Sequence, residues 1–194
     1  MLWPRAQRQD DLIVSDTFLE GERLFVRPPC FSDLEPWIEA RGRNQAYLTE
    51  YEPRWAEEAL TPSFFMRRLK RQKRDWEERR GYSFLIFKKD AGGLIGGINL
   101  NNVIWGAARH AQIGYWLDEA YQGQGFMTDA ARLVIRFAFD EIDLKRINAS
   151  CLPGNERSAR LLARLGFEEE GFARAYLQIN GIWQDHRLFG LNQA

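Results

Sequence analysis

Residues 122–128, with the sequence QGQGFMT, could hold a phosphate through their main chain. They follow a strand pattern, and apolar residues with helical spacing begin at Met127. A glycine-rich turn at a helix start leaves several N–H groups without helical partners, and the helix dipole adds positive potential there. The segment is not a Walker loop, because no Gly-Lys-Ser/Thr follows, and Thr128 replaces the third glycine of the dinucleotide motif. It predicts a phosphate or pyrophosphate site, with a tight turn that needs glycine for its backbone angles as the alternative.

Polar side chains elsewhere in the sequence form a second group of candidate site residues. Asn155 and Ser158 stand at the start of a short helical pattern, where they also suit a helix cap and an ordinary first-turn residue. His110, Asp185 and His186 could accept a proton from an attacking group, although each histidine equally suits a structural role. Because the chain has two histidines and no ligand spacing, we expect no metal site.

The elements that must position these residues alternate between strand and helix patterns. Strands are predicted at 23–27, 82–88, 94–100, 111–117, 146–152, 175–179 and 182–189. Helices are predicted after a cap at Asp33, at 61–80, at 125–140, and from Asn155 to a left-handed cap at Gly166. The three strands between 82 and 117 should form an antiparallel meander. The pattern predicts an α/β (α+β) fold with helices packed on one central sheet.

Composition places the chain among globular proteins. It has 194 residues, of which 45% are hydrophobic and 28% charged, which suits one domain with a substantial core. We expect residues 1–20 to form an N-terminal extension and residues 21–194 a single domain. Lys+Arg and Asp+Glu both number 27, so no overall basic excess favours nucleic-acid binding. The two cysteines, Cys30 and Cys151, are far apart in sequence and suggest buried free thiols.

The chain shows no sign of membrane insertion or export. No apolar run approaches the length of a membrane span, and the N-terminal sequence MLWPRAQRQDD lacks the apolar core of a signal peptide. We therefore expect a cytoplasmic protein without a membrane partner. The sequence leaves its oligomeric state open.

The spacing Gln122-x-x-Gly125-x-Met127 resembles the R/Q-x-x-G-x-G/A signature with which GNAT acetyltransferases hold the pyrophosphate of acetyl-coenzyme A (acetyl-CoA). It departs from that signature at Met127, where the family has Gly or Ala. The chain is similar to the RimJ/RimL branch, the ribosomal-protein-alanine N-acetyltransferases, through residues 153–186. The likeness covers most of the chain after about residue 20. It implies acetyl-CoA as co-substrate and a mixed, mostly antiparallel sheet with helices on both faces. Strands 111–117 and 146–152 would be parallel and splayed, with the thioester in the gap.

The resemblance also assigns roles to site residues. Acetyl-CoA would contact Tyr115, Trp116, Leu117, Gln122, Gly123, Gln124, Gly125, Phe126, Met127, Thr128, Asn155 and Ser158. Many relatives have a tyrosine that acts as the general acid at the position of Leu162. Because this chain lacks it, we expect Ser158 to donate a hydrogen bond to the departing thiolate or to relay a proton. A main-chain N–H of strand 111–117 would bind the acetyl oxygen, and we expect the side chains there to matter less.

The resemblance predicts an enzyme that acetylates the α-amine of a protein N-terminus, in particular Ala or Ser of a ribosomal protein. The amine would attack directly through a tetrahedral intermediate, with Asp185, His186 or His110 as the base. An α-amine of pKa about 7.7–8.0 is roughly a tenth neutral at pH 7, so it needs less help than lysine. Two alternatives remain: an acetyltransferase for a small amine (polyamine, antibiotic or amino acid), and a ribosome-docking module with little catalysis.

The predicted helix 61–80 carries a local excess of positive charge. Its exposed part has eight basic residues (Arg67, Arg68, Lys70, Arg71, Lys73, Arg74, Arg79 and Arg80) against the three acids Asp75, Glu77 and Glu78, an excess of five. A solvated face is one interpretation, because charge runs usually have that role. The other is a patch that contacts ribosomal RNA or an anionic assembly surface.

Overall fold

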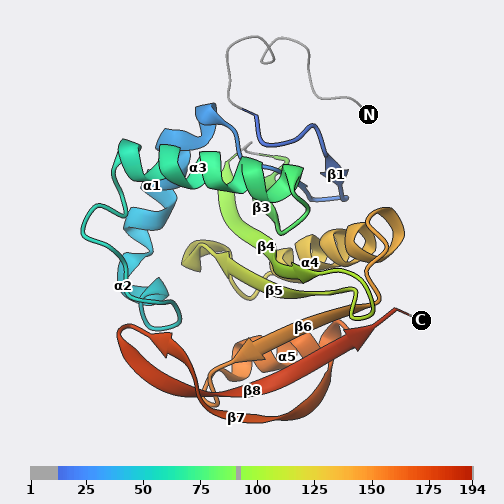
Figure 1. Cartoon of the computed structure of the whole chain (residues 1–194). Coiled ribbons are helices and arrows are strands. Elements are labelled where there is room, and N and C mark those ends of the chain that lie inside the picture. The colour runs from blue at the N-terminus through green and yellow to red at the C-terminus, as the bar shows by residue number, and fades with distance from the viewer. Residues whose placement is uncertain (1–12, 91–92, 194) are drawn as a thin grey trace.

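The computed structural model describes residues 13–90 and 93–193 of the chain. One sheet of eight strands, in the order β1-β2-β3-β4-β5-β6-β8-β7, runs through this part (Figure 1). Its strands are β1 (Leu19–Glu20), β2 (Leu24–Arg27), β3 (Tyr82–Lys88), β4 (Leu94–Ile104), β5 (His110–Leu117), β6 (Arg146–Cys151), β7 (Glu168–Ile179) and β8 (Ile182–Asn192). All neighbours are antiparallel except β5 and β6, which are parallel.

Helices cover both faces of the sheet, as the family resemblance implied (Figure 1). The helices are α1 (Leu34–Arg43), α2 (Gln45–Leu48), α3 (Pro62–Glu77), α4 (Phe126–Arg136), which continues as a π-helical turn (Phe137–Glu141), and α5 (Glu156–Arg164). Side chains of α4 and α5 join one hydrophobic core, and those of α1 and α3 join a second core on the opposite face. Because both faces of β3 are covered, Phe84 and Leu85 are both buried, although they point in opposite directions.

The parallel pair β5 and β6 opens in the middle of the sheet. His110–Gln112 pairs with Arg146–Asn148, and beyond these residues the two strands diverge (Figure 1). The prediction of parallel, splayed strands at 111–117 and 146–152 is therefore confirmed. The opening lies beside the residues that the sequence singled out, because β5 leads into residues 122–128 and β6 leads into Asn155.

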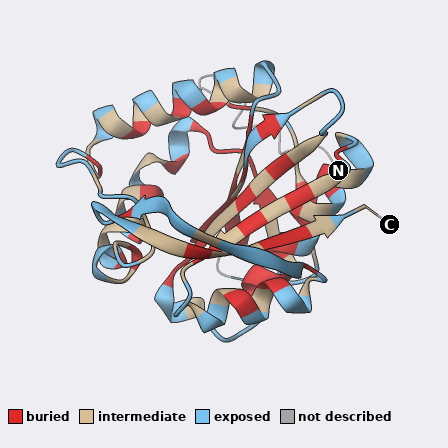
Figure 2. Cartoon of the chain, turned by 60° about the horizontal axis from the view of Figure 1, so that its bottom comes forward, coloured by how far each residue is buried: buried red, intermediate tan, exposed pale blue. Residues whose placement is uncertain are grey.

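Some element boundaries differ from those predicted. Helix α3 begins as expected, with Thr61 Oγ1 accepting a hydrogen bond from Phe64 N at 3.3 Å and Pro62 in the first turn, but it ends at Glu77. Strand β7 begins seven residues before the predicted Ala175, at Glu168. Nearly all of β7 is exposed on both faces (Figure 2), so its first half has no alternation of apolar and polar residues to reveal it.

Residues 13–20, expected as part of an extension, contribute to the domain. Leu19 and Glu20 pair with Val26 and Phe25 of β2, and Val14 is buried against the core on the α1 and α3 face. The sheet therefore extends on the N-terminal side of the boundary expected at residue 20. Residues 1–12 of the expected extension lie outside the described residues.

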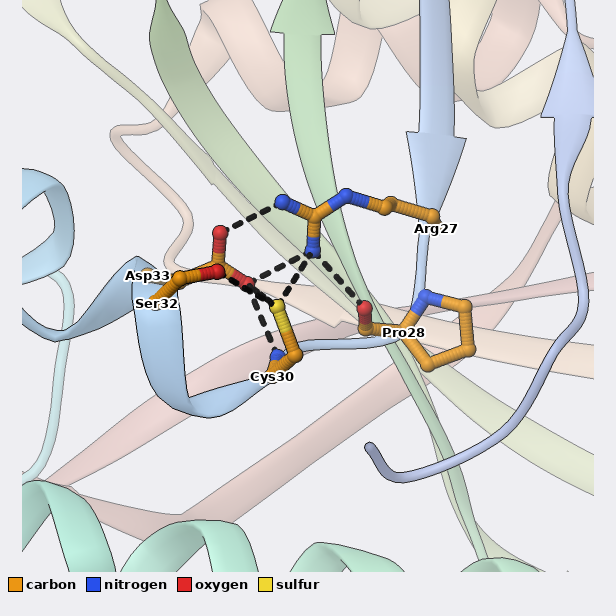
Figure 3. Close-up of polar contacts among 5 residues, drawn as sticks. All are labelled: Arg27, Pro28, Cys30, Ser32 and Asp33. Atoms are coloured by element: carbon orange, nitrogen blue, oxygen red, sulfur yellow. Dashed lines mark hydrogen bonds and ion pairs between the residues drawn. The ribbon is translucent and has the colours of Figure 1, made fainter. Parts of the chain in front are cut away.

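A buried ion pair fixes the connection between β2 and α1 (Figure 3). The Arg27 guanidinium donates to both carboxylate oxygens of Asp33, with Nη1–Oδ2 at 2.6 Å and Nη2–Oδ1 at 2.5 Å. Asp33 Oδ2 also accepts from the Cys30 N–H at 2.8 Å. Asp33 is the N-cap residue of α1, as predicted, but its side chain makes no cap hydrogen bond, because the carboxylate turns back towards β2. This contact orients α1, which carries two residues of the cavity described below.

In the described part of the chain, no helix combines the length and the apolar character required to cross a bilayer. The same residues contain no group of three or more His, Cys, Asp or Glu side chains placed to hold a metal ion. Cys30 and Cys151 are both free and buried, as predicted.

Candidate active site

A cavity of about 1090 Å³ passes through the opening between β5 and β6. Its lining includes residues from both faces of the sheet. On one face it meets Gly123, Gly125, Arg157, Arg160 and Arg164, from the start of α4 and from α5, which we call the α4 mouth. On the other it meets Trp37, Arg41, Glu52, Arg68 and Arg71, from α1, α3 and the segment after α2, which we call the α3 mouth. Two molecules could therefore enter from opposite faces and meet between the strands.

The loop at the α4 mouth offers main-chain donors to an anion. Gly123 and Gly125 have left-handed φ angles of +71° and +83°, and Gly125 is the N-cap of α4. Among the described residues, the N–H groups of residues 123–128 have no hydrogen-bond acceptor. Arg23 supports the loop, since its Nη1 donates to Gln124 O at 3.0 Å and its Nε to Asp129 Oδ2 at 3.0 Å. This geometry fits a pyrophosphate group.

Three arginines of α5 add positive charge to the same mouth. Arg157, Arg160 and Arg164 follow the i, i+3, i+7 spacing of one helix face, and all three line the cavity. Arg157 Nη1 donates to Gln122 Oε1, and Arg164 Nη1 lies 3.5 Å from Thr128 Oγ1. We did not single out these arginines from the sequence, although their spacing is visible there. They complement the phosphates of a nucleotide-derived ligand.

Tyr115 and Ser158 meet in the opening of the sheet. Tyr115 Oη lies 2.7 Å from Ser158 Oγ, and both residues line the cavity. Asn155 Oδ1 accepts a hydrogen bond from Ser158 N at 3.0 Å, so Asn155 caps α5 and holds Ser158 in place. Burial raises the pKa of Tyr115 to about 12, against the lowering effect of the hydrogen bond with Ser158. The Tyr115 hydroxyl therefore stays protonated at neutral pH and can donate a hydrogen bond to Ser158.

The main chain of β5 also presents donors to the opening. Asp118 N donates to Ile95 O of the neighbouring segment at 2.8 Å. Main-chain groups of a strand alternate in direction, so the N–H of Trp116 also points towards β4, whereas those of Tyr115 and Leu117 point towards β6. No residue of β5 after Gln112 pairs with β6 in the described structure. Of the three positions singled out on this strand, Tyr115 and Leu117 therefore direct an N–H into the opening.

The chain matches the acetyltransferase (GNAT) domain family over residues 23–168, which includes α4, α5 and the opened strands. It belongs to the GNAT family. A probable N-acetyltransferase of Bacillus subtilis is 36% identical over 173 residues, which cover 89% of this chain and 96% of that protein. The [ribosomal protein uS5]-alanine N-acetyltransferase of Escherichia coli is 35% identical over 175 residues, covering 89% of each chain. The structure of Mycobacterium smegmatis RimJ with CoA-disulfide superposes with a TM-score of 0.87 at 27% identity, covering 93% of this chain and 89% of that one.

Membership of the GNAT family makes the protein an acetyl-CoA-dependent N-acyltransferase. The α4 mouth has the donor groups that this co-substrate requires, in the unpaired N–H groups of residues 123–128 and the arginines of α5. Phe126, Met127 and Thr128 provide the first turn of α4, and Gln124 Nε2 closes the loop by donating to Ala120 O at 3.0 Å. Met127, which departs from the family signature, is buried in the core beneath the loop.

The three residues considered as a GNAT base occupy different environments. His186 is buried and lines the cavity, and its Nδ1 lies 3.0 Å from Gln184 O. Because a carbonyl oxygen only accepts, Nδ1 is the donor in this contact, and in the neutral form of the ring Nε2 is then an acceptor. Asp185 Oδ1 instead accepts from the Ala175 N–H at 2.8 Å, and His110 Nδ1 lies 3.3 Å from Asn148 Nδ2 at the paired end of β5. Neither Asp185 nor His110 lines the cavity.

The basic residues predicted to share one exposed face of helix 61–80 occupy different environments in the structure. Arg67 pairs with Glu58 and Arg80 with Asp75, both at 3.1 Å between Nη2 and a carboxylate oxygen. Arg68, expected on the exposed face, is half-buried and lines the cavity, so that expectation is wrong. The prediction failed because the helix places Arg68 on the side of Phe65 and Leu69, which face the core.

Proposed function

We propose that the protein transfers acetyl from acetyl-CoA to the α-amine of a protein N-terminus, with Ala or Ser of a ribosomal protein as the expected acceptor. The observation that carries the proposal is the proton acceptor available in the cavity, a single imidazole, His186, with no unpaired carboxylate in the described lining. An α-amine is already partly neutral at pH 7 and can react with such limited help, whereas the neutral fraction of a lysine side chain is much smaller. The name of the Escherichia coli relative supports the ribosomal acceptor.

The geometry suggests how this chain would carry out the transfer. Acetyl-CoA, when bound, supplies an acetyl thioester. The N–H groups of Tyr115 and Leu117 would donate to the carbonyl oxygen as it gains negative charge. His186 Nε2 would take the proton of the attacking amine, directly or through a water molecule. Tyr115 would donate to Ser158, which would donate to the departing sulfur and stabilise it as a thiolate.

The acceptor would enter through the α3 mouth, because the phosphate site occupies the α4 mouth. Six arginines line the whole cavity (Arg41, Arg68, Arg71, Arg157, Arg160 and Arg164) against one carboxylate, Glu52, among the described residues. Glu52 is already held by Arg41, with Nη1–Oε1 at 2.7 Å and Nη2–Oε2 at 2.5 Å. A polyamine would therefore find repulsion and no free anion, which argues against the polyamine alternative. The complete set of main-chain donors argues against a docking module without catalysis.

The test is a competition between acceptors. The enzyme is incubated with acetyl-CoA and equal concentrations of spermidine and a short peptide that begins with Ala and contains no lysine. We expect acetylation of the peptide, located at its α-amine by mass spectrometry, with little product from spermidine. Faster acetylation of spermidine would contradict the proposal.

A further inference from the structure

Arg68 places a positive charge inside the α3 mouth. It lies on α3 between the buried residues Phe65 and Leu69, is half-buried, and lines the cavity. Its guanidinium carbon lies 5.7 Å from the centre of the Trp37 ring. Among the described residues, no carboxylate lies within ion-pair distance of Arg68. A cation held in such a place without a direct ion pair can receive an anion.

The neighbours of Arg68 increase this positive character. Arg71 lines the same mouth, and so does Arg41, whose charge is balanced by Glu52. Glu52 Oε2 also accepts from Trp55 Nε1 at 2.8 Å, so this carboxylate is fully engaged. Burial, followed by repulsion from Arg41 and Arg71, lowers the pKa of Arg68 to about 10. Glu52 counters this shift only in part, and a negative group that entered the mouth would offset it further.

The phosphates of acetyl-CoA do not account for Arg68. Helix α3 belongs to the core on one face of the sheet, whereas the unpaired N–H groups of residues 123–128 and the arginines of α5 belong to the other face. Those groups already supply the phosphate site. An anion that binds Arg68 would therefore arrive with the molecule that enters by the α3 mouth.

We propose that Arg68, assisted by Arg71, binds a carboxylate carried by the acceptor itself, namely an acidic side chain within the first few residues of the protein whose α-amine is acetylated. This inference rests on the proposed function and deepens it, because it defines a sequence preference. The acidic residue would anchor the N-terminal segment through Arg68, and the α-amine would then reach the opening between β5 and β6.

The test begins with the wild-type enzyme and a peptide series. Each peptide starts with Ala, lacks lysine, and has a single Glu or, in its matched partner, Gln at position 2, 3, 4 or 5. We expect kcat/KM to be about ten- to a hundredfold higher for Glu than for Gln at one or two positions, as for one charge-assisted hydrogen bond. Equal values at all four positions would overturn the inference, and this result does not depend on any variant folding.

The second stage assigns the preference to Arg68. In Arg68→Gln the ratio between the Glu and Gln peptides should fall to about one, while the KM for acetyl-CoA stays at its wild-type value. Arg74→Gln, at an exposed arginine of the same helix that does not line the cavity, should retain the wild-type ratio. A folded Arg68→Gln that keeps the full Glu preference would overturn the assignment. Failure of the proposed function would appear in a different measurement, namely equal acetylation of two peptides with the same side chains, one with a free and one with a blocked N-terminus.

Discussion

At the scale of single residues, the contact between Tyr115 and Ser158 is the feature that sequence reasoning described least well. Ser158 was expected beside the departing sulfur, but for Tyr115 only the main-chain groups were expected to contribute to the site. The structure joins their hydroxyl groups at 2.7 Å, although 43 positions separate them in the sequence. Strand alternation predicts which face Tyr115 occupies, but only the fold shows that this face meets the first turn of α5. This chain has Leu162 where many relatives have a tyrosine, and Tyr115 brings a phenol to the site from a different element.

We predict that Ser158→Ala and Tyr115→Phe both lower kcat and leave the affinity for acetyl-CoA nearly unchanged. Loss of a hydrogen bond to a developing thiolate is worth roughly 1.5–3 kcal/mol, so Ser158→Ala should cost about ten- to a hundredfold in rate. Tyr115→Phe should have a smaller effect because it acts through Ser158. Single-turnover kinetics would measure the chemical step. If the double variant showed the product of the two single effects, the two hydroxyls would act independently and the relay would be ruled out.

The pKa of Tyr115 gives a second prediction at this scale. Burial raises it from the ordinary value of 10.0 to about 12 in the folded protein. The stability that this shift contributes is complete below pH 10 and is lost as the pH rises from 10 to about 12. Ultraviolet titration of tyrosinate, compared between wild type and Tyr115→Phe, should show one group that ionises near pH 12. Ionisation of Tyr115 near pH 10 would mean that it is not enclosed as described.

At the scale of elements, the loop at the start of α4 was predictable because its chemistry is local. Glycines at 123 and 125, a preceding strand and a following apolar period all lie within one short stretch of sequence. The splay of β5 and β6 could not be derived in this way and came from the family resemblance, because their pairing depends on residues more than thirty positions apart. The first half of β7 was missed because exposure on both faces removes the pattern on which strand prediction depends.

We predict that Gly125→Val abolishes the thermal stabilisation of the protein by acetyl-CoA. A Cβ at residue 125 would lie 3.1 Å from Arg23 Nη2, and the left-handed φ of +83° disfavours a branched side chain. Gly106→Val is the matched control, because Gly106 has a φ of +74° in a turn that does not line the cavity. Both variants should lose stability without ligand, but Gly106→Val should keep the shift on adding acetyl-CoA. A normal shift in folded Gly125→Val would refute the assignment of the loop.

The Arg27–Asp33 pair gives a further prediction at the scale of elements. Asp33→Asn leaves the Arg27 cation buried without its counter-charge, so the free energy of unfolding should fall by about 3 kcal/mol. Glu58→Gln, which removes the exposed pair with Arg67, should change it by less than about 1 kcal/mol. Urea denaturation monitored by tryptophan fluorescence measures both values. Equal effects of the two substitutions would show that the buried pair does not hold α1 to β2.

At the scale of the whole molecule, the cavity passes through the sheet and opens on two faces, to which we assign the two reactants. The sequence pattern predicted the helices and the phosphate loop, and the family resemblance placed helices on both faces, but neither predicted that α3 turns Arg68 inward. A run of charges is ambiguous because side-chain direction depends on where the helix packs. The neutral net charge of the chain therefore gave no sign of a cavity whose described lining has six arginines and one paired carboxylate.

The most direct test of the account compares two amines in matched peptides. One peptide begins with a free Ala and has no lysine; the other has the same composition except for a blocked N-terminus and one internal lysine. At pH 7 the two amines differ by about 2.5 pKa units, or about 300-fold in neutral fraction, which a single imidazole would not restore. We predict that kcat/KM for the free Ala N-terminus exceeds that for lysine by about two orders of magnitude. Equal values, or a preference for the lysine peptide, would contradict the assignment of an N-terminal acetyltransferase.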